Sequence, residues 1–149
     1  MARPPRVHIQ NRQRSLKTDA REIRALVTRV LEGESAGVGL VGVVMLRDAA
    51  MAELNARYRG RPGPTDVLSF PAGTAGWPAE EPAWLGEVVV SVDRARAQAA
   101  ERRRRVRDEL RRLIVHGVLH LCGYRDDLPR QRVRMRRRED HYLRPSPRR

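Results

Sequence analysis

The segment HGVLHLCGYRDD, residues 116–127, holds the side chains best suited to binding a metal ion. On a helix, His116 and His120 project from one face about one turn apart, which is how a helix presents two imidazole nitrogens to one zinc ion. Gly123 can end that helix and let the chain turn back, so that a third ligand follows it. Asp126 stands at that place. The pattern His-x-x-x-His-x-x-Gly-x-x-Asp therefore predicts one zinc-type ion (Zn²⁺) per chain.

The residues around this motif leave other assignments open. Asp127 is a rival third ligand one residue out of register, and His141 is a weaker one. The structural alternative is a pair of packed histidines on an apolar helix, with Gly117 as a packing glycine. Zinc peptidases are disfavoured, because they place a glutamate directly after the first histidine as general base, and Gly117 occupies that position. A phosphodiester of RNA, which is already anionic and has a neighbouring 2′-hydroxyl, suits such a site better.

The charge of the chain also indicates an anionic partner. The net charge is +13, and Lys17 is the only lysine, so nearly all of this charge is arginine. Such a balance favours a polyanion, and nucleic acid first. Because only 4% of the residues are aromatic, we do not expect base stacking to be the main binding device.

Length and hydropathy favour a folded cytoplasmic protein of one domain, residues 1–149. The chain is 40% hydrophobic, which is enough to bury a core. Cys122 is the only cysteine, which excludes an internal disulfide and a cysteine-based zinc finger. No apolar run approaches the roughly 20 residues of a membrane span, and the N-terminal MARPPRVHIQ lacks the apolar core of a signal peptide. We expect no membrane partner.

The elements that must position the motif follow from the spacing of apolar residues. Strands are expected at residues 6–10, 38–46, 67–70 and 87–92. Helices are expected at residues 18–33 with Thr18 or Asp19 as N-cap, from Asp48 to Tyr58, in two stretches between Asp93 and Gly123, and at residues 129–143. A long loop rich in Gly, Pro and Ala precedes the last strand, and such a loop is usually functional or mobile.

Three segments in the same order resemble one protein family. HGVLHLCGY, residues 116–124, is similar to the segment His-Gly-x-Leu-His-Leu-x-Gly-Tyr-Asp-His of the YbeY family of bacterial endoribonucleases and rRNA maturation factors. LNARYRGRPGPTDVLSFP, residues 54–71, resembles that family's Leu-Asn-x-x-Tyr-Arg-x-x-x-x-Pro-Thr-Asp-Val-Leu-Ser-Phe-Pro. LGEVVVSVDRARAQA, residues 85–99, resembles its Leu-Gly-Asp-Ile-x-Ile-Ser strand and the helix that follows.

The resemblance implies an α/β fold, with a small mixed β-sheet of about four strands packed by helices and the metal site on a C-terminal helix and the following turn. It implies a zinc-dependent hydrolase that cleaves single-stranded RNA in rRNA maturation and ribosome quality control. The implied partners are single-stranded RNA, rRNA and the small ribosomal subunit, without DNA specificity. Carried over by position, His116 and His120 are metal ligands, with His116 also catalytic, and Arg59 is the basic residue that faces the active-site cleft.

The chain departs from the family pattern at the third ligand. The family has Asp-His after Gly-Tyr, whereas this chain has Arg125 and Asp126. The third ligand would then be a carboxylate, which is well precedented for zinc. The nucleophile would be water on the metal or the substrate 2′-hydroxyl. The alternative function is a ribosome-associated assembly factor that binds RNA without cutting it, with a degenerate metal site.

Overall fold

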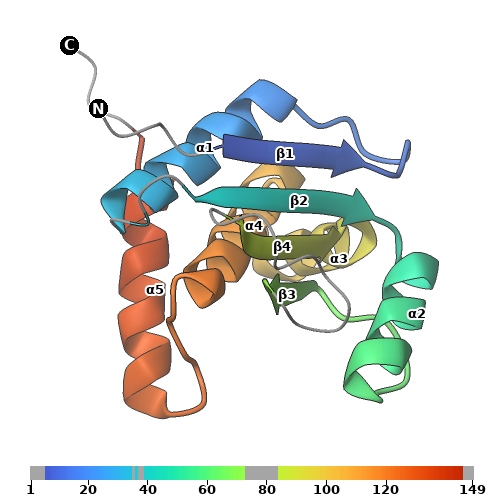
Figure 1. The fold of residues 1–149 in the computed structure, drawn as a ribbon. Coiled ribbons are helices and arrows are strands. Elements are labelled where there is room, and N and C mark those ends of the chain that lie inside the picture. Colours follow the sequence, from blue (N-terminus) through green and yellow to red (C-terminus); the bar gives the residue numbers. More distant parts are fainter. Residues whose placement is uncertain (1–5, 35, 37–38, 73–83, 146–149) are drawn as a thin grey trace.

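The fold is a mixed β-sheet with helices packed on it (Figure 1). The computed structural model describes residues 6–34, 36, 39–72 and 84–145. In chain order the elements are β1 (Arg6–Asn11), α1 (Ala20–Gly33), β2 (Leu40–Leu46), α2 (Asp48–Arg59), β3 (Val67–Pro71), β4 (Trp84–Ser91), α3 (Val92–Arg102), α4 (Val106–Leu121) and α5 (Pro129–Leu143). The strands lie in the order β1-β2-β4-β3, with β3 alone antiparallel to its neighbour. The expected α/β fold with a four-stranded mixed sheet is confirmed.

The sheet buries apolar side chains on both faces, because successive side chains of a strand point to opposite sides. On one face, Val43 and Val88 belong to the larger core, which includes residues of α1, α4 and α5. On the other face, Val44 and Val89 form a smaller core with Met51 of α2. None of the helices in the described part of the chain is both long enough and apolar enough to cross a membrane.

Helix α4 packs against the sheet and against three other helices. It contacts β3, β4, α1, α3 and α5, and Figure 1 shows it behind the sheet. At Gly117 the helix approaches β4 so closely that an added Cβ would lie 2.5 Å from Val88 Cγ1. Ser69 of β3 also donates a hydrogen bond from Oγ to the carbonyl oxygen of Gly117, at 2.9 Å. Gly117 is therefore a packing glycine, and the sheet leaves no room there for the glutamate of a zinc peptidase.

A cluster around Glu34 joins the end of α1 to α5 and to the turn that follows α4. The Glu34 carboxylate accepts hydrogen bonds from the hydroxyls of Tyr124, at 2.7 Å, and of Tyr142, and from Arg138 Nη2 at 2.5 Å. Burial by itself raises the pKa of Glu34, but the hydrogen bonds from Tyr142, Tyr124 and Arg138 outweigh it and hold that pKa below its ordinary value. We call these four residues the Glu34 cluster.

Several element bounds differ from those expected. Strand β4 ends at Ser91 rather than at residue 92, because the Ser91 side chain accepts a hydrogen bond from the Arg94 amide and caps α3. Helix α4 ends at Leu121, and Gly123 lies in the turn with φ 103°. Of the two N-caps proposed for α1, Asp19 is the one used. The expected long loop falls largely on residues 73–83, outside the described residues.

Candidate metal centre

The two histidines of α4 face each other at the surface of the helix. His116 and His120 lie one turn apart, and their Nε2 atoms are 3.1 Å from each other. Their side chains are 26% and 28% exposed, so both imidazoles are held by the protein yet reached by solvent. The i, i+4 geometry expected from the sequence is therefore present.

Asp126 reaches the same point from the turn after α4. Its Oδ2 lies 3.5 Å from His116 Nε2 and 3.3 Å from His120 Nε2. Gly123 makes this return possible, because a φ of 103° is readily adopted only by glycine. Among the described residues, His116, His120 and Asp126 form the group of histidine, cysteine and acidic side chains that could hold a metal ion. We call these three residues the donor group.

The distances within the donor group fit a tetrahedral ion. Zinc ligands at about 2.0–2.2 Å in tetrahedral geometry lie about 3.3–3.6 Å from one another. The three separations here are 3.1, 3.3 and 3.5 Å, so one ion could contact all three atoms with little movement. Three protein ligands would leave a fourth position open, which is the arrangement of catalytic rather than structural zinc sites.

The other ring nitrogen of each histidine is held by an acceptor. His116 Nδ1 lies 2.9 Å from Oε2 of Glu139 on α5, and His120 Nδ1 lies 2.9 Å from the carbonyl oxygen of Tyr124. An acceptor at Nδ1 favours the tautomer with the proton there, which leaves the Nε2 lone pair free to bind a metal. Both imidazoles are thus oriented as metal ligands usually are.

Carboxylates also create a negative field at this point. Burial by itself lowers the pKa of His116, but the hydrogen bond and charge of Glu139, with the charges of Asp126 and Asp66, raise that pKa above its ordinary value. The surroundings therefore favour positive charge at the imidazole, and a divalent cation would experience the same field.

The rival ligands lie elsewhere. The carboxylate of Asp127 forms an ion pair with Arg125, 2.8 Å from its Nη2 to Asp127 Oδ2. His141 lies on α5 with its ring against that of Tyr142, at a centroid distance of 4.9 Å. Neither belongs to the donor group. The geometry therefore favours Asp126 over both.

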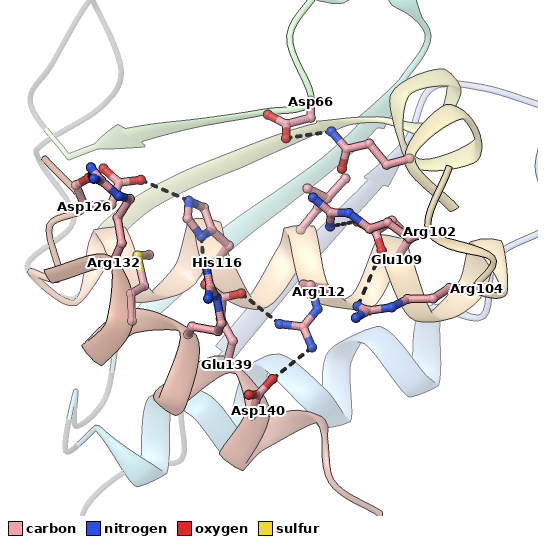
Figure 2. A pocket seen from close by; sticks show the side chains of 14 residues that line it. Asp66, Arg102, Arg104, Glu109, Arg112, His116, Asp126, Arg132, Glu139 and Asp140 are labelled. Carbon is pink, nitrogen blue, oxygen red and sulfur yellow. Dashed lines mark hydrogen bonds and ion pairs between the residues drawn. The ribbon is translucent and has the colours of Figure 1, made fainter. Parts of the chain in front are cut away.

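Two cavities meet at the donor group. One, of about 560 Å³, is lined by Arg59 at the end of α2, by residues 65–71, and by all three residues of the donor group. The other, of about 540 Å³, lies between α4, α5 and the corner joining α3 to α4, and shares His116 and Asp126 with the first (Figure 2). Arg59, which the family resemblance implied to face the cleft, lines a cavity that includes the donor group.

Asp66 lines both cavities, but its carboxylate is hydrogen-bonded to groups other than the two histidines. Its carboxylate accepts from the Val67 amide at 2.7 Å and from the Gln98 side chain at 3.0 Å. Asp66 therefore fixes the entry to β3 and ties it to α3, and it acts on His116 through its charge rather than through a direct bond.

A comparison with known families identifies the chain. The family model described as "Endoribonuclease YbeY" matches residues 8–146. The chain belongs to the YbeY family. Two proteins named endoribonuclease YbeY illustrate the similarity. The YbeY of Moorella thermoacetica is 37% identical over 135 residues, which cover 82% of this chain and 85% of the relative. That of Syntrophus aciditrophicus is 36% identical over 118 residues, covering 79% and 74%.

A solved structure shares the fold of this chain. The solution structure of TM1509 from Thermotoga maritima matches with a TM-score of 0.59 and 24% identity, over 92% of this chain and 86% of that one. At this identity the likeness concerns the fold alone. The sheet and the helices that position the donor group therefore occur together in another solved protein.

Two groups at this YbeY-family site were not predicted from the sequence. Glu139 is an acidic residue within the arginine-rich α5, and this contrast was the signal that could have singled it out. The Tyr124 carbonyl is a backbone group, so the residue type at this position gives no sign that it orients His120. Both act through Nδ1 of a histidine, and that relation depends on how α5 and the turn pack against α4.

Proposed function

We propose that this protein is a metal-dependent endoribonuclease that cleaves single-stranded RNA, with residues 1–149 acting as one domain. The observation that supports the proposal most is the donor group: three atoms at 3.1–3.5 Å, with both histidine Nδ1 atoms already occupied. The names of the YbeY relatives support RNA as the substrate. The net charge of +13 also favours a polyanion.

The roles of the individual residues follow from where they lie. His116, His120 and Asp126 would hold one zinc-type ion, which when bound supplies a Lewis acid for a phosphoryl oxygen. Arg59, in the same cavity, can hold two phosphate oxygens through its planar guanidinium and stabilise the charge that develops as the phosphodiester is cleaved. Glu139 and the Tyr124 carbonyl keep the imidazoles oriented.

In the cell, we assign this activity to maturation of ribosomal RNA and to ribosome quality control in the cytoplasm, with the small ribosomal subunit as partner. These finer roles rest on the resemblance to the YbeY family. Cleavage at this site would require a single strand of RNA facing the donor group and Arg59. A single strand can bend into the cleft, whereas the phosphates of a duplex are fixed along a rigid helix.

A cleavage assay with metal control tests the proposal. Protein stripped with a chelator should cut single-stranded RNA at a background rate, and addition of zinc or another divalent ion should restore cleavage. DNA of the same sequence serves as the control substrate and should stay intact. A protein that binds RNA in every metal state and cuts none would contradict the proposal and favour the assembly-factor function.

Replacing Asp126 should weaken metal binding far more than replacing its neighbour. Asp126→Ala removes one atom of the donor group and should lower metal affinity by about 10-fold or more, at least as much as loss of a group that only orients a ligand. Asp127→Ala is the matched control, because it removes an exposed carboxylate paired with Arg125. Asp126→His should retain the metal. Competition with a chromophoric chelator measures all three, and the reverse order would make Asp127 the ligand.

Glu139 should affect metal binding through His116. Glu139→Gln removes the charge next to His116 Nδ1 and should lower metal affinity by about 10-fold, within the range for groups that orient a metal ligand. Asp140→Asn is the control, since Asp140 also pairs with Arg112 but has no bond to His116. Equal effects of the two variants, measured by the same competition, would show that only packing of α5 matters.

A further inference from the structure

The second cavity at the donor group is bordered by a concentration of arginines. We call it the arginine pocket; its arginines are Arg102, Arg104, Arg112, Arg132 and Arg136. In Figure 2, Arg132 lies at one end beside Asp126, Arg102 and Arg104 lie at the other, and His116 lies between them on α4. The pocket thus extends from the donor group along α4, away from the cavity that Arg59 lines.

The carboxylates of this pocket already have partners. Arg112 lies between Glu139, at 3.1 Å, and Asp140, at 3.0 Å. Glu109 is fully buried. Its carboxylate pairs with Arg102 at 2.6 Å and with Arg104 at 4.0 Å, so two guanidiniums share one carboxylate. Asp126 belongs to the donor group, and Asp66 accepts from Val67 and Gln98.

The corner that presents Arg102 and Arg104 is conformationally costly. Arg103, between them, has φ 53°, in the left-handed region that side chains other than glycine seldom adopt. Glycine would fit that backbone more easily, and strained backbone of this kind is often found at functional sites. This left-handed residue is the C-cap of α3, and it ends the helix between the two flanking arginines.

Two arginines of the pocket have no carboxylate partner among the described residues. Arg132 donates from Nη1 to the carbonyl oxygens of Asp126, at 3.1 Å, and Asp127, at 3.2 Å. Arg136, one turn farther along α5, is exposed and forms no ion pair with a described residue. Their charges are therefore available to an anion that enters beside the donor group.

We propose that the arginine pocket binds a phosphate of the RNA strand that flanks the phosphate being cut. The inference rests on the proposed function. A single strand would run from the Arg59 cavity across the donor group and into the arginine pocket, because both cavities share His116 and Asp126. Each, at about 540–560 Å³, has the size of a pocket for one small ligand such as a nucleotide. A polymer with a phosphate at every residue could place one phosphate at Arg59 and a neighbouring one at Arg132 and Arg136, with the donor group between them.

Neutral linkages in the substrate test this proposal. A set of short single-stranded RNAs would carry one uncharged methylphosphonate each, moved stepwise along both sides of the cut bond. With wild-type protein, one flanking position should raise KM by about 5-fold, the size expected for an exposed charge pair. Arg136→Gln should raise KM of the unmodified RNA by a similar factor, leave kcat unchanged, and abolish the penalty at that position.

The control variant is Arg24→Gln, which removes the same charge from an exposed position on α1 that lines neither cavity. It should leave both KM and the pattern of penalties as in wild type. A penalty that persists in Arg136→Gln, or disappears equally in Arg24→Gln, would overturn the arginine pocket as a phosphate site. A wild-type protein that cuts none of these RNAs contradicts the proposed function instead, so the two failures are distinct.

Discussion

His120→Ala should lose both bound metal and RNA cleavage. The substitution removes one of two imidazole donors and leaves His116 Nε2 and Asp126 Oδ2 as the remaining atoms of the donor group. We expect metal affinity to fall by more than about 100-fold, the upper range for groups that only orient a ligand. Elemental analysis after dialysis against metal-free buffer measures the metal content. The cleavage rate of single-stranded RNA should fall with it.

The matched control is His141→Ala. It removes the imidazole of α5, which packs against Tyr142 and lies outside the donor group. Its metal content and cleavage should match those of wild type. The far-ultraviolet circular dichroism of both variants reports whether the fold is retained. A folded His120→Ala protein with undiminished metal would show that the ion, if any, is bound elsewhere.

Arg59→Ala should separate binding of RNA from its cleavage. Arg59 is exposed at the end of α2 and lines a cavity with the donor group, so its guanidinium can reach a phosphate there. If it stabilises charge that develops in the transition state, its loss should lower kcat by about 100-fold or more, as loss of an oxyanion donor does. Affinity for RNA, measured with the metal removed, should change by less than about 10-fold.

Arg57→Ala is the control for Arg59. Arg57 lies on the same helix, with its guanidinium over the Tyr58 ring at 5.9 Å, and it lines neither cavity. It should alter RNA affinity slightly and kcat little. Equal losses of affinity and kcat in Arg59→Ala would reassign Arg59 to a contact with the bound substrate that does not strengthen in the transition state.

The parts of the structure that the sequence predicted are those governed by local rules. The i, i+4 histidines share a helix face, Gly123 adopts a positive φ, and the apolar runs become the four strands. The donor group that these rules predicted is assembled in the structure, whereas its role as a ligand set stays a prediction. The resemblance to the YbeY family supplied the small mixed sheet packed by helices, and the family match confirms that resemblance.

What the sequence did not reveal depends on contacts between distant elements. Glu139 reaches His116 only because α5 packs across α4, and apolar spacing does not fix the rotation of α5 about its axis. The RRRR run at residues 102–105 has the composition of a solvated helix face, yet it forms the corner between α3 and α4, where Arg102 pairs with the buried Glu109. Buried ion pairs of this kind have no signature in hydropathy.

The Glu34 cluster makes completion of the site depend on α5, which is synthesised after the donor group. Tyr124 contributes its hydroxyl to Glu34 and its carbonyl to His120, so the same residue joins the end of α1 to the donor group. Arg138 and Tyr142, which complete the cluster, and Glu139, which orients His116, all lie on α5. A growing chain that ended before α5 would hold His116, His120 and Asp126 without these supports. A nascent fragment without α5 would thus lack the contact that orients His116, and the proposed activity would await translation of α5.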